Sequence, residues 1–483
     1  MTPAEHLDVV IVGAGLSGIG AAYHVRTYCP SKTYAILEAR ACSGGTWDLF
    51  RYPGVRSDSD MYTLGYSFRP WTDPHAIADG ASILAYIRDT AAAYGIDRKI
   101  RYRHRAIAVR WSSAEARWTL DVRVDDARIV QLTCSFLFTC TGYYDYAAGY
   151  TPELPGRARY RGRIVHPQQW PADLDYTGKR VIVIGSGATA VTLVPTLAAK
   201  AAHVTMLQRS PSYVISLPSR DRVADALRAV LPAGAAHDLV RWKSVLLGMG
   251  FYELSRRFPE RARRLLVAGV EQALGTSTDV RTHFSPRYNV WDQRVCFVPD
   301  ADLFRAIRDG RASVVTDHIA TFTETGLALR SGATLDADII ITATGLVLQF
   351  LGGMTLAVDG ERVDPAKLLV FNGMMTSNVP NFAFASGYTN ASWTLKVDLV
   401  SRYVCRLLAH MDEHGYRAVR PIRTNPAMQE LPVIDFSSGY VQRALADMPR
   451  QGSERPWRLY QNYVLDLLTL RYGRVDDRAL RFT

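Results

Sequence analysis

The sequence is poor in cysteine, and none of its six cysteines is placed as a metal-binding or redox pair. No two form Cys-x-x-Cys, and no histidine stands beside them at zinc-finger spacing. A chain of 483 residues is long enough to bury large cores without disulfides or a structural metal. We therefore interpret the cysteines as reduced thiols of a cytoplasmic protein and expect no metal site.

Long runs of basic or apolar residues are also absent. The net charge is +11, but no run of five or six Lys or Arg occurs, so no nucleic-acid partner is expected, and the charge favours an anionic ligand. The uncharged window 339–358 contains three glycines and three threonines, which predicts a buried strand and a turn, not a membrane span. The first residues carry no basic segment ahead of an apolar run, so no signal peptide is expected.

A Ser-His-Asp hydrolase motif, a Walker loop and a His-Glu-x-x-His segment are missing as well, so hydrolysis and metal chemistry have no support. What the sequence does contain is a repeated strand–turn–helix pattern. Residues 8–12 and 180–184 are β-branched runs, each followed by a glycine-rich turn and a helical stretch. Two such units predict an α/β fold with two Rossmann-like dinucleotide-binding domains. The residues assigned to the two turns are Gly13, Gly15, Ser17 and Gly18, and then Gly185, Ser186, Gly187, Ala188, Thr189, Ala190 and Val191.

The pattern along the chain also suggests how the domains are divided. Strand signals stop between 218 and 285, where Arg, Ala, Leu and Val recur at helical spacing, and this predicts a helical insertion. We expect one dinucleotide-binding domain over 1–145 and 340–483, and the other over 146–217 and 286–339.

The residues that follow the second strand of each unit differ in charge. Glu38 closes the strand in the first unit, and a carboxylate there can accept both ribose hydroxyls of FAD or NAD. The second unit has Gln208, Arg209 and Ser210 at that place, and a guanidinium with a hydroxyl suits the 2′-phosphate of NADPH. A flavin beside a nicotinamide predicts an oxidoreductase that transfers hydride between them.

Two segments carry a family resemblance. Residues 44–58 are Gly-Gly-Thr-Trp-Asp-Leu-Phe-Arg-Tyr-Pro-Gly-Val-Arg-Ser-Asp, and residues 160–171 are Tyr-Arg-Gly-Arg-Ile-Val-His-Pro-Gln-Gln-Trp-Pro. They resemble the paired fingerprints of type I Baeyer–Villiger monooxygenases, (Ala/Gly)-Gly-x-Trp-x4-(Phe/Tyr)-Pro-(Gly/Met)-x3-Asp and Phe-x-Gly-x3-His-x3-Trp-(Pro/Asp). Residues 291–294 and 387–396 extend the resemblance over almost the whole chain, and it is strongest to a mycobacterial group that oxidises ketones, sulfides and thioamides. Tyr160 departs from the fingerprint Phe, and Gln293 stands where many members have Lys beside the 2′-phosphate of NADPH.

The resemblance implies FAD and NADPH as cofactors and O₂ as co-substrate. In this family a flavin C4a-peroxide converts ketones into esters or lactones and oxidises soft sulfur. Arg294 matches the active-site arginine, a fixed cation for the peroxide and the tetrahedral oxyanion, and Asp58 is expected to hold it by a charge-assisted hydrogen bond. An NADPH-dependent flavin reductase or oxidase, or a redox-sensing flavoprotein, is the alternative.

The resemblance also assigns roles to residues outside the two turns. It implies that Gly162, His166 and Trp170 couple the two domains. His166 is not expected to act as a general base. Residues matched to flavin contacts are Gly45, Thr46, Trp47, Asp48, Leu49, Asp58 and Ala106, and residues matched to NADPH contacts are Arg56 and Ser57. A small-molecule ketone or sulfide is the expected substrate.

Overall fold

The computed structural model describes residues 4–276 and 278–483, and its larger sheet belongs to the first nucleotide-binding unit. The strands run in the spatial order β18-β17-β4-β5-β6-β1-β2-β3, with β21 paired to β6. Their bounds are β1 Glu5–Val12, β2 Tyr34–Leu37, β3 Ile100–Arg101, β4 His104–Ser112, β5 Arg117–Val124, β6 Arg128–Thr139, β17 Thr355–Val358, β18 Glu361–Arg362 and β21 Phe382–Phe384. The centre is parallel, because β1 pairs with β2 and β6 in the same direction, and an antiparallel β4–β5–β6 meander extends it.

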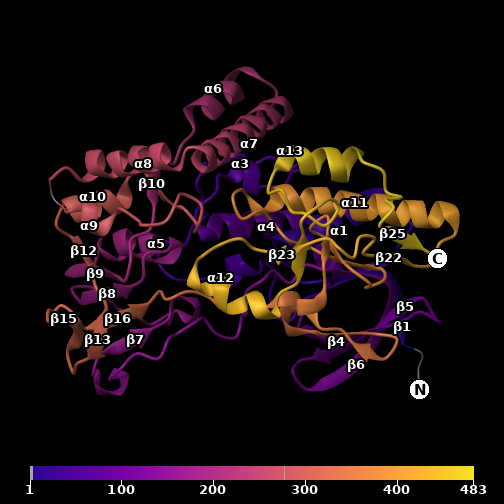
Figure 1. Ribbon diagram of the computed structural model, residues 1–483, viewed down its shortest axis with the longest axis horizontal. Helices are drawn as coiled ribbons and strands as arrows, with labels where there is room; N and C mark the ends of the chain where they lie inside the picture. Colours follow the sequence, from indigo (N-terminus) through magenta and orange to yellow (C-terminus); the bar gives the residue numbers. More distant parts are fainter. Residues whose placement is uncertain (1–3, 277) are drawn as a thin grey trace.

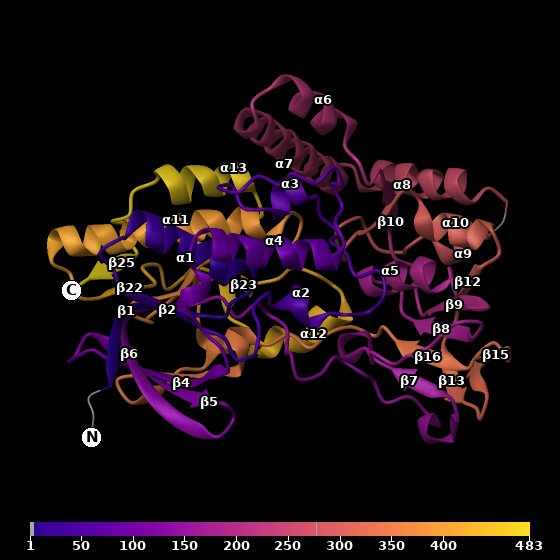
Figure 2. The same cartoon turned by 180° about the vertical axis from the view of Figure 1, so that it is seen from behind.

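Helices cover one face of this sheet (Figures 1 and 2). They are α1 Leu16–Tyr28, α2 Thr46–Leu49, α3 Met61–Leu64, α4 Gly80–Ala93 and α11 Trp393–His414. Val9, Ile11 and Ile36 pack against α1 and α11 in one core, and Val10, Leu37 and Trp118 pack in a second core on the opposite face of the sheet. Burial on both faces explains why the second half of β1, residues 9–12, is a continuous run of β-branched residues without alternation.

The second nucleotide-binding unit has a smaller sheet, in which all paired strands are parallel. The order is β12-β9-β8-β16-β7, with bounds β7 Arg163–Val165, β8 Arg180–Ile184, β9 His203–Gln208, β12 Ala312–Thr316 and β16 Ile339–Thr342. Helices α5 Ala188–Leu197 and α10 Asp302–Arg308 pack against one face, and an antiparallel meander, β13 Ile319–Phe322, β14 Gly326–Leu329 and β15 Thr334–Asp336, packs against the other. The strand predicted within 339–358 is β16.

The segment predicted to be helical does form helices. They are α6 Arg222–Val230, α7 Ala233–Arg257, α8 Pro259–Leu274 and α9 Val280–His283, flanked by the parallel pair β10 Val214–Leu217 and β11 Cys296–Pro299. Helices α6 and α7 project from the top of the molecule as it is drawn in Figure 1. In the part of the chain that the structure describes, no helix has the length and apolar character to cross a membrane.

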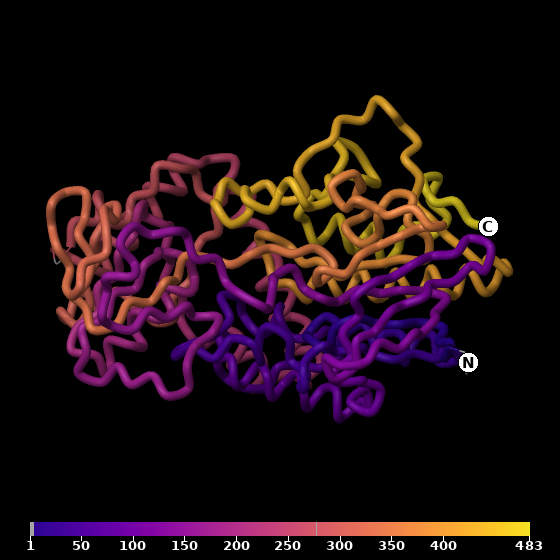
Figure 3. The backbone as a smooth tube through the Cα atoms, turned by 90° about the horizontal axis from the view of Figure 1, so that it is seen from below, coloured from indigo at the N-terminus to yellow at the C-terminus, as the bar shows by residue number. Residues whose placement is uncertain are grey.

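The last quarter of the chain returns to the first unit and contains short elements that the sequence pattern did not predict. They are the two-stranded pairs β19 Val370–Phe371 with β20 Met375–Thr376, β22 Val419–Pro421 with β25 Leu480–Phe482, and β23 Glu430–Pro432 with β24 Arg450–Gly452, together with helices α12 Gly439–Ala444 and α13 Tyr463–Asp466 and the π-helical segment Leu467–Tyr472. Both chain ends lie on the first unit, which faces the second across the molecule (Figure 3). Helix α12 lies between the two units (Figure 1).

Candidate active site

A cavity of about 810 Å³ lies between the two nucleotide-binding units, and both glycine-rich turns open into it. Of the residues singled out from the sequence, those lining it are Gly15, Ser17, Gly45, Thr46, Trp47, Ser57, Asp58, Gly185, Ser186, Gly187, Ala188, Thr189, Arg209, Ser210, Gln293 and Arg294. Segments far apart in the sequence therefore meet at one site. Parallel strands end at this edge of each sheet, which is where ligands of such folds bind.

The first turn brings backbone close to backbone. Gly13 has φ +104°, and a Cβ on Gly18 would lie 1.8 Å from the carbonyl oxygen of Gly13, so neither position has room for a larger residue. Helix α1 begins after Gly15 without a side-chain cap. The N–H groups of its first turn therefore face the cavity and are free to bind a pyrophosphate, as the cofactor requires.

Glu38 is buried directly behind this turn. Its two carboxylate oxygens accept hydrogen bonds from the backbone N–H groups of Ala14 (2.8 Å) and Arg40 (2.9 Å). Burial raises the pKa of this carboxyl above its ordinary value. Each oxygen keeps a second lone pair, so the side chain that fixes the turn can still accept the hydroxyls of a ribose.

The second turn has the same framework with more space. The N–H of Gly13 donates to the carbonyl oxygen of Leu37 (2.7 Å), and that of Gly185 donates to Leu207 (2.8 Å), so Gln208 is the equivalent of Glu38. Helix α5 also starts without a side-chain cap, and a Cβ on Gly187 would meet no atom within 4 Å.

The three side chains at the end of β9 differ in burial: the first is buried and hydrogen-bonded, and the next two are exposed. Gln208 is buried and donates to the carbonyl oxygen of His283 (2.7 Å) and to Thr316 Oγ1 (2.8 Å). Arg209 and Ser210 are exposed at the cavity wall. Within the described part of the chain Arg209 forms no ion pair, and an exposed guanidinium of this kind suits the 2′-phosphate that the sequence assigned to it.

Arg294 and Asp58 meet across the two units. Arg294 lies just before β11 of the second unit, and both its Nε and its Nη2 donate to Oδ2 of Asp58 at 2.8 Å. The hydrogen bond predicted between them is thus present. The carboxylate of Asp58 raises the pKa of Arg294, so this guanidinium is charged at every working pH.

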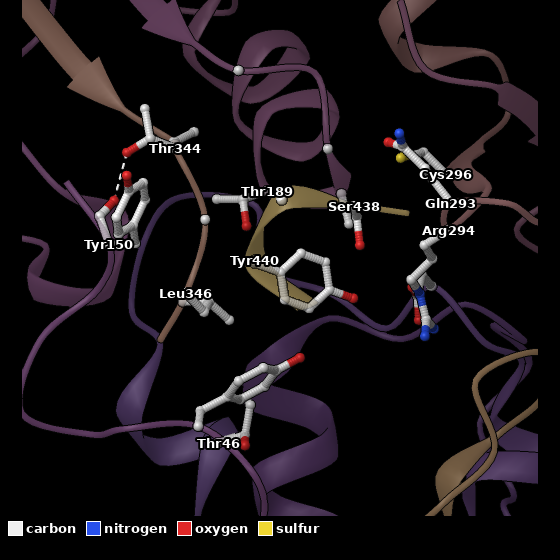
Figure 4. A pocket seen from close by; sticks show the side chains of 18 of the residues that line it. Thr46, Tyr150, Thr189, Gln293, Arg294, Cys296, Thr344, Leu346, Ser438 and Tyr440 are labelled. Carbon is white, nitrogen blue, oxygen red and sulfur yellow. Dashed lines mark hydrogen bonds and ion pairs between the residues drawn. The ribbon is translucent and has the colours of Figure 1, made fainter. Parts of the chain in front are cut away.

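Tyrosines fill the space around this pair. The hydroxyls of Tyr143 and Tyr144 are 2.7 Å apart, and Tyr440 from α12 lies in the centre of the cavity with its hydroxyl directed toward the side that holds Arg294 (Figure 4). Burial raises the pKa of Tyr440 to about 12, so it is protonated at neutral pH and can donate a hydrogen bond.

A second, smaller cavity of about 110 Å³ adjoins the first. Arg294, Tyr143 and Tyr440 line both spaces. The remaining wall of the small cavity is mostly apolar and comes from the C-terminal third of the chain, including Phe350, Leu351, Phe384, Ile434, Phe436, Met448 and Leu459.

The first fingerprint joins the two units. A Cβ on Gly54 would lie 2.1 Å from Oγ1 of Thr196 on α5, which explains the glycine. Arg56 does not line the cavity, because its guanidinium pairs with Asp302 at the start of α10 (2.5 Å). The contact of Arg56 with NADPH stays a prediction.

Three of the proposed flavin contacts also lie outside the cavity lining. Asp48 is buried, and its carboxylate accepts from Arg40 (2.5 Å), Arg88 (2.8 Å) and the thiol of Cys42 (3.0 Å). These contacts support the loop at residues 42–51. Leu49 ends the short helix α2, and Ala106 is buried in β4. Five other predicted cofactor contacts do not line the cavity either, and they stay predictions together with the previous three: Gly13, Gly18, Glu38, Ala190 and Val191.

The second fingerprint fastens the segments that connect the units. The Nε2 of His166 donates to the carbonyl oxygen of Gly345 (3.2 Å), and its Nδ1 accepts from the backbone N–H of Gln168 (3.2 Å). Tyr150 donates its backbone N–H to the same carbonyl of Gly345 (3.0 Å), so the outgoing and returning connections share one acceptor. Burial lowers the pKa of His166, which keeps the ring neutral. This arrangement supports domain coupling, because neither ring nitrogen is free for bond-making.

Two other fingerprint positions have structural explanations. A Cβ on Gly162 would lie 2.3 Å from the hydroxyl of Tyr160 and 2.6 Å from the carbonyl oxygen of Asp338. Tyr160, where the fingerprint has Phe, is buried and donates to the carbonyl oxygen of Ala337 (3.0 Å), so its extra hydroxyl is satisfied. Trp170 packs at the edge of the core of the second unit.

Several cavity residues were not assigned a role from the sequence. Tyr388 and Trp393 fall in the stretch 387–396, which carried the resemblance, and Trp393 Nε1 donates to Ser17 Oγ (2.8 Å). Arg443 on α12 stacks over the ring of Tyr150 at 3.4 Å and lines the cavity. No local spacing distinguishes these residues, because they reach the site from the C-terminal segment.

Comparisons with known proteins identify relatives of the whole chain. The family model described as flavin-binding monooxygenase-like matches residues 63–226, and that of an NAD(P)-binding Rossmann-like domain matches residues 11–75. The FAD-containing monooxygenase EthA of Mycobacterium tuberculosis is 55% identical over 479 residues, covering 99% of this chain and 98% of that protein. EthA of Mycolicibacterium smegmatis is 53% identical over 480 residues, covering 99% and 97%.

Solved structures share the fold. A steroid monooxygenase bound to NADP superposes with a TM-score of 0.77 at 22% identity, covering 99% of both chains. Cyclohexanone monooxygenase from Rhodococcus sp. Phi1 bound to NADP+ gives a TM-score of 0.76 at 18% identity, covering 100% of both.

Fold and site together define a flavoprotein monooxygenase with two dinucleotide-binding units, which confirms the α/β fold and the cofactors FAD and NADPH inferred from the sequence. The chain belongs to the family of EthA-type FAD-containing monooxygenases, of the type I Baeyer–Villiger kind.

Proposed function

We propose that this enzyme inserts oxygen into small apolar ketones and onto the sulfur of sulfides or thioamides, with Arg294 as the cation that the reaction needs. The observation that carries the proposal is the Asp58–Arg294 pair at the junction of the two cavities. When bound, FAD and NADPH supply hydride transfer and oxygen activation. The protein's part is to bind, to orient and to stabilise charge.

The two nucleotide turns divide the cofactors. The turn backed by Glu38 binds FAD, and the turn flanked by Arg209 and Ser210 binds NADPH. We assign residues 1–145 and 340–483 to the FAD domain, 146–217 and 286–339 to the NADPH domain, and 218–285 to a helical insertion. The six unpaired thiols and the dependence on NADPH support a cytoplasmic location.

The side chains around Arg294 fit an electrophilic carbonyl with an apolar body. Arg294 is held in one orientation by Asp58, and a fixed cation in a site shielded from water stabilises negative charge that develops on oxygen. Tyr440 adds a protonated hydroxyl on the same side of the cavity. The apolar wall of the smaller cavity would bind the hydrocarbon part of the substrate and select against charged molecules.

Replacing Arg294 tests the proposal. In Arg294→Ala, NADPH consumption should continue, while the yield of ester from an aryl methyl ketone should fall by about a hundredfold or more. Product is measured by chromatography and NADPH by absorbance in the same sample. The matched control is Arg256→Ala, because Arg256 is also paired with an aspartate (Asp292) but lies outside both cavities. Unchanged product formation in Arg294→Ala would refute the role of this cation.

A further inference from the structure

The helical insertion exposes an unusual amount of apolar side chain. Among the described residues, eighteen large apolar side chains are exposed, and nine of these lie between residues 222 and 274, about a ninth of the chain. They are Val223, Val230, Leu239, Trp242, Leu246, Leu247, Leu254, Phe258 and Leu265. A concentration of this kind marks a surface that contacts a partner or a membrane.

Five of these side chains lie on one face of α7. Leu239, Leu246 and Leu254 follow helical spacing, with Trp242 and Leu247 beside them, and the four leucines are 52–65% exposed. The opposite face holds the helix on the protein through buried Val240 and Val245 and through polar contacts. Its Arg241 is buried and donates to the backbone carbonyls of Tyr62 (2.7 Å) and Gly65 (2.8 Å). Helix α7 therefore carries apolar residues on its outer face as well as on its buried face, whereas a helix packed on a soluble core has a polar outer face.

The apolar face continues onto the C-terminal segment. The ring of Trp242 contacts that of Tyr463 on α13 edge-on at 5.7 Å. The π-helical segment that follows exposes Leu468 (56%) and Tyr472 (68%). In both Figure 1 and Figure 2, α7 and α13 lie at the same upper side of the molecule, so the two segments form one raised surface, which we call the α7 face.

Basic side chains surround this surface. Residues 222–274 contain nine Lys or Arg and five Asp or Glu, but three of the nine, Arg241, Lys243 and Arg256, pair with aspartates outside this range. Arg257 and Arg261 are both exposed and lie over the ring of Phe258, at 5.8 and 5.4 Å. Arg471 lies likewise over exposed Tyr472 (5.8 Å). Arginine next to exposed aromatic rings is the composition of a surface that enters the headgroup layer of a lipid bilayer.

We propose that the α7 face docks the enzyme onto an anionic lipid surface, with Trp242, Leu246 and Leu247 inserted among the acyl chains and the arginines bound to lipid phosphates. Charge selects this occupant over a second copy of the chain, because two such faces would bring their excess positive charges together. The helix has 25 residues and lies along the membrane plane without crossing it.

Vesicle co-sedimentation of the full-length enzyme with its FAD bound tests the proposal. Vesicles of phosphatidylcholine alone are compared with vesicles in which about one-third of the lipid is phosphatidylglycerol. We expect binding to the anionic vesicles, weakened by added salt, and little binding to phosphatidylcholine alone. Leu246→Ser/Leu247→Ser should lower the partition coefficient by about tenfold or more, and Arg257→Gln/Arg261→Gln should lower binding to the anionic vesicles specifically.

The matched control is Ile129→Ser, because Ile129 is 59% exposed on β6, away from the insertion. FAD content and circular dichroism verify that each variant is folded. Equal vesicle binding by the enzyme and by Leu246→Ser/Leu247→Ser would overturn the proposal. So would a dimer, seen by sedimentation velocity, that dissociates in this variant while the native enzyme ignores both kinds of vesicle, since the second copy would then be the partner.

Discussion

The two strand–turn–helix units start from the same hydrogen bond and diverge at the next residue. In both, the first glycine of the turn donates to the carbonyl oxygen of a leucine at the end of the neighbouring strand. The first unit then places buried Glu38 under its turn, where two backbone N–H groups bind it. The second turns Gln208 away into the domain and leaves Arg209 exposed.

This difference suggests how one chain manages two cofactors. The first turn is part of the packed core, and its ligand-binding carboxylate also holds the backbone in place. Its cofactor is expected to stay bound through many turnovers. The second turn presents its recognition groups from the outside, so a cofactor can enter, react and leave without disturbing the fold. FAD fits the first behaviour and NADPH the second.

The largest expected effect comes from closing the space in the first turn. In Gly18→Ala, the added Cβ would overlap the carbonyl oxygen of Gly13, so the variant should lose FAD and fold poorly. Ala190, at the corresponding position of the second turn, already carries a Cβ, and Gly187→Ala, whose Cβ would meet no protein atom within 4 Å, should fold and retain FAD. FAD content after gel filtration measures both. A Gly18→Ala protein that keeps its FAD would refute the claim that the first turn has no space for a Cβ at this position.

Next in size is removal of the charged residue behind the first turn. Glu38→Ala leaves two buried N–H groups without an acceptor, which should lower the free energy of unfolding by about 2–4 kcal/mol and weaken FAD binding. Gln208→Ala, the matched change in the second unit, should leave FAD binding unchanged. Urea unfolding and FAD titration of the apoprotein test the pair. Equal loss of FAD affinity in both variants would contradict the assignment of FAD binding to Glu38 and not to Gln208.

A smaller and more selective effect is expected at the second turn. Arg209→Ala should raise the Kd of NADP+ by about ten- to a hundredfold and leave the Kd of NAD+ nearly unchanged, because only NADP+ has the 2′-phosphate. Equilibrium dialysis measures both constants without turnover. Arg443→Ala is an informative control, since Arg443 lines the same cavity but lies on α12. If NAD+ binding weakened as much as NADP+ binding, Arg209 would not be the residue that binds the 2′-phosphate.

The smallest effect is a pH dependence confined to the first unit. Burial raises the pKa of Glu38 above its ordinary value of 4.5, so between the two pKa values the folded apoprotein binds more protons than the unfolded chain. The contribution of this group to the free energy of unfolding therefore falls as pH rises from about 4.5 through the folded pKa. Glu38→Gln should flatten this part of the profile. An unchanged slope in urea unfolding would contradict the raised pKa.

Sequence reasoning reached the parts of the site that depend on local pattern. The glycines at 13 and 185 are required by positive φ values, and the fingerprint aspartate was assigned to the partner that it contacts, Arg294. Such features are visible because a turn or a family motif specifies them within a few residues. The charge contrast between Glu38 and Arg209 was visible for the same reason.

Features that depend on long-range packing were not visible. Tyr440 and Arg443 reach the cavity on a helix of six residues, α12, whose position depends on how the C-terminal segment crosses between the units. Arg56 was matched to NADPH, yet the structure pairs it with Asp302, 246 residues away in the sequence. Helical spacing predicted α7 but not that its leucines would face outward, because periodicity does not state which face is covered.

One measurement tests the central account most directly. The FAD-containing enzyme is mixed without oxygen with NADPH or NADH, the bleaching of flavin absorbance is followed, and oxygen is then added together with a thioether. The account predicts much faster bleaching by NADPH than by NADH at equal concentration, followed by one sulfoxide for each NADPH consumed. Rapid bleaching followed by stoichiometric hydrogen peroxide and no sulfoxide would contradict it and identify a flavin reductase or oxidase instead.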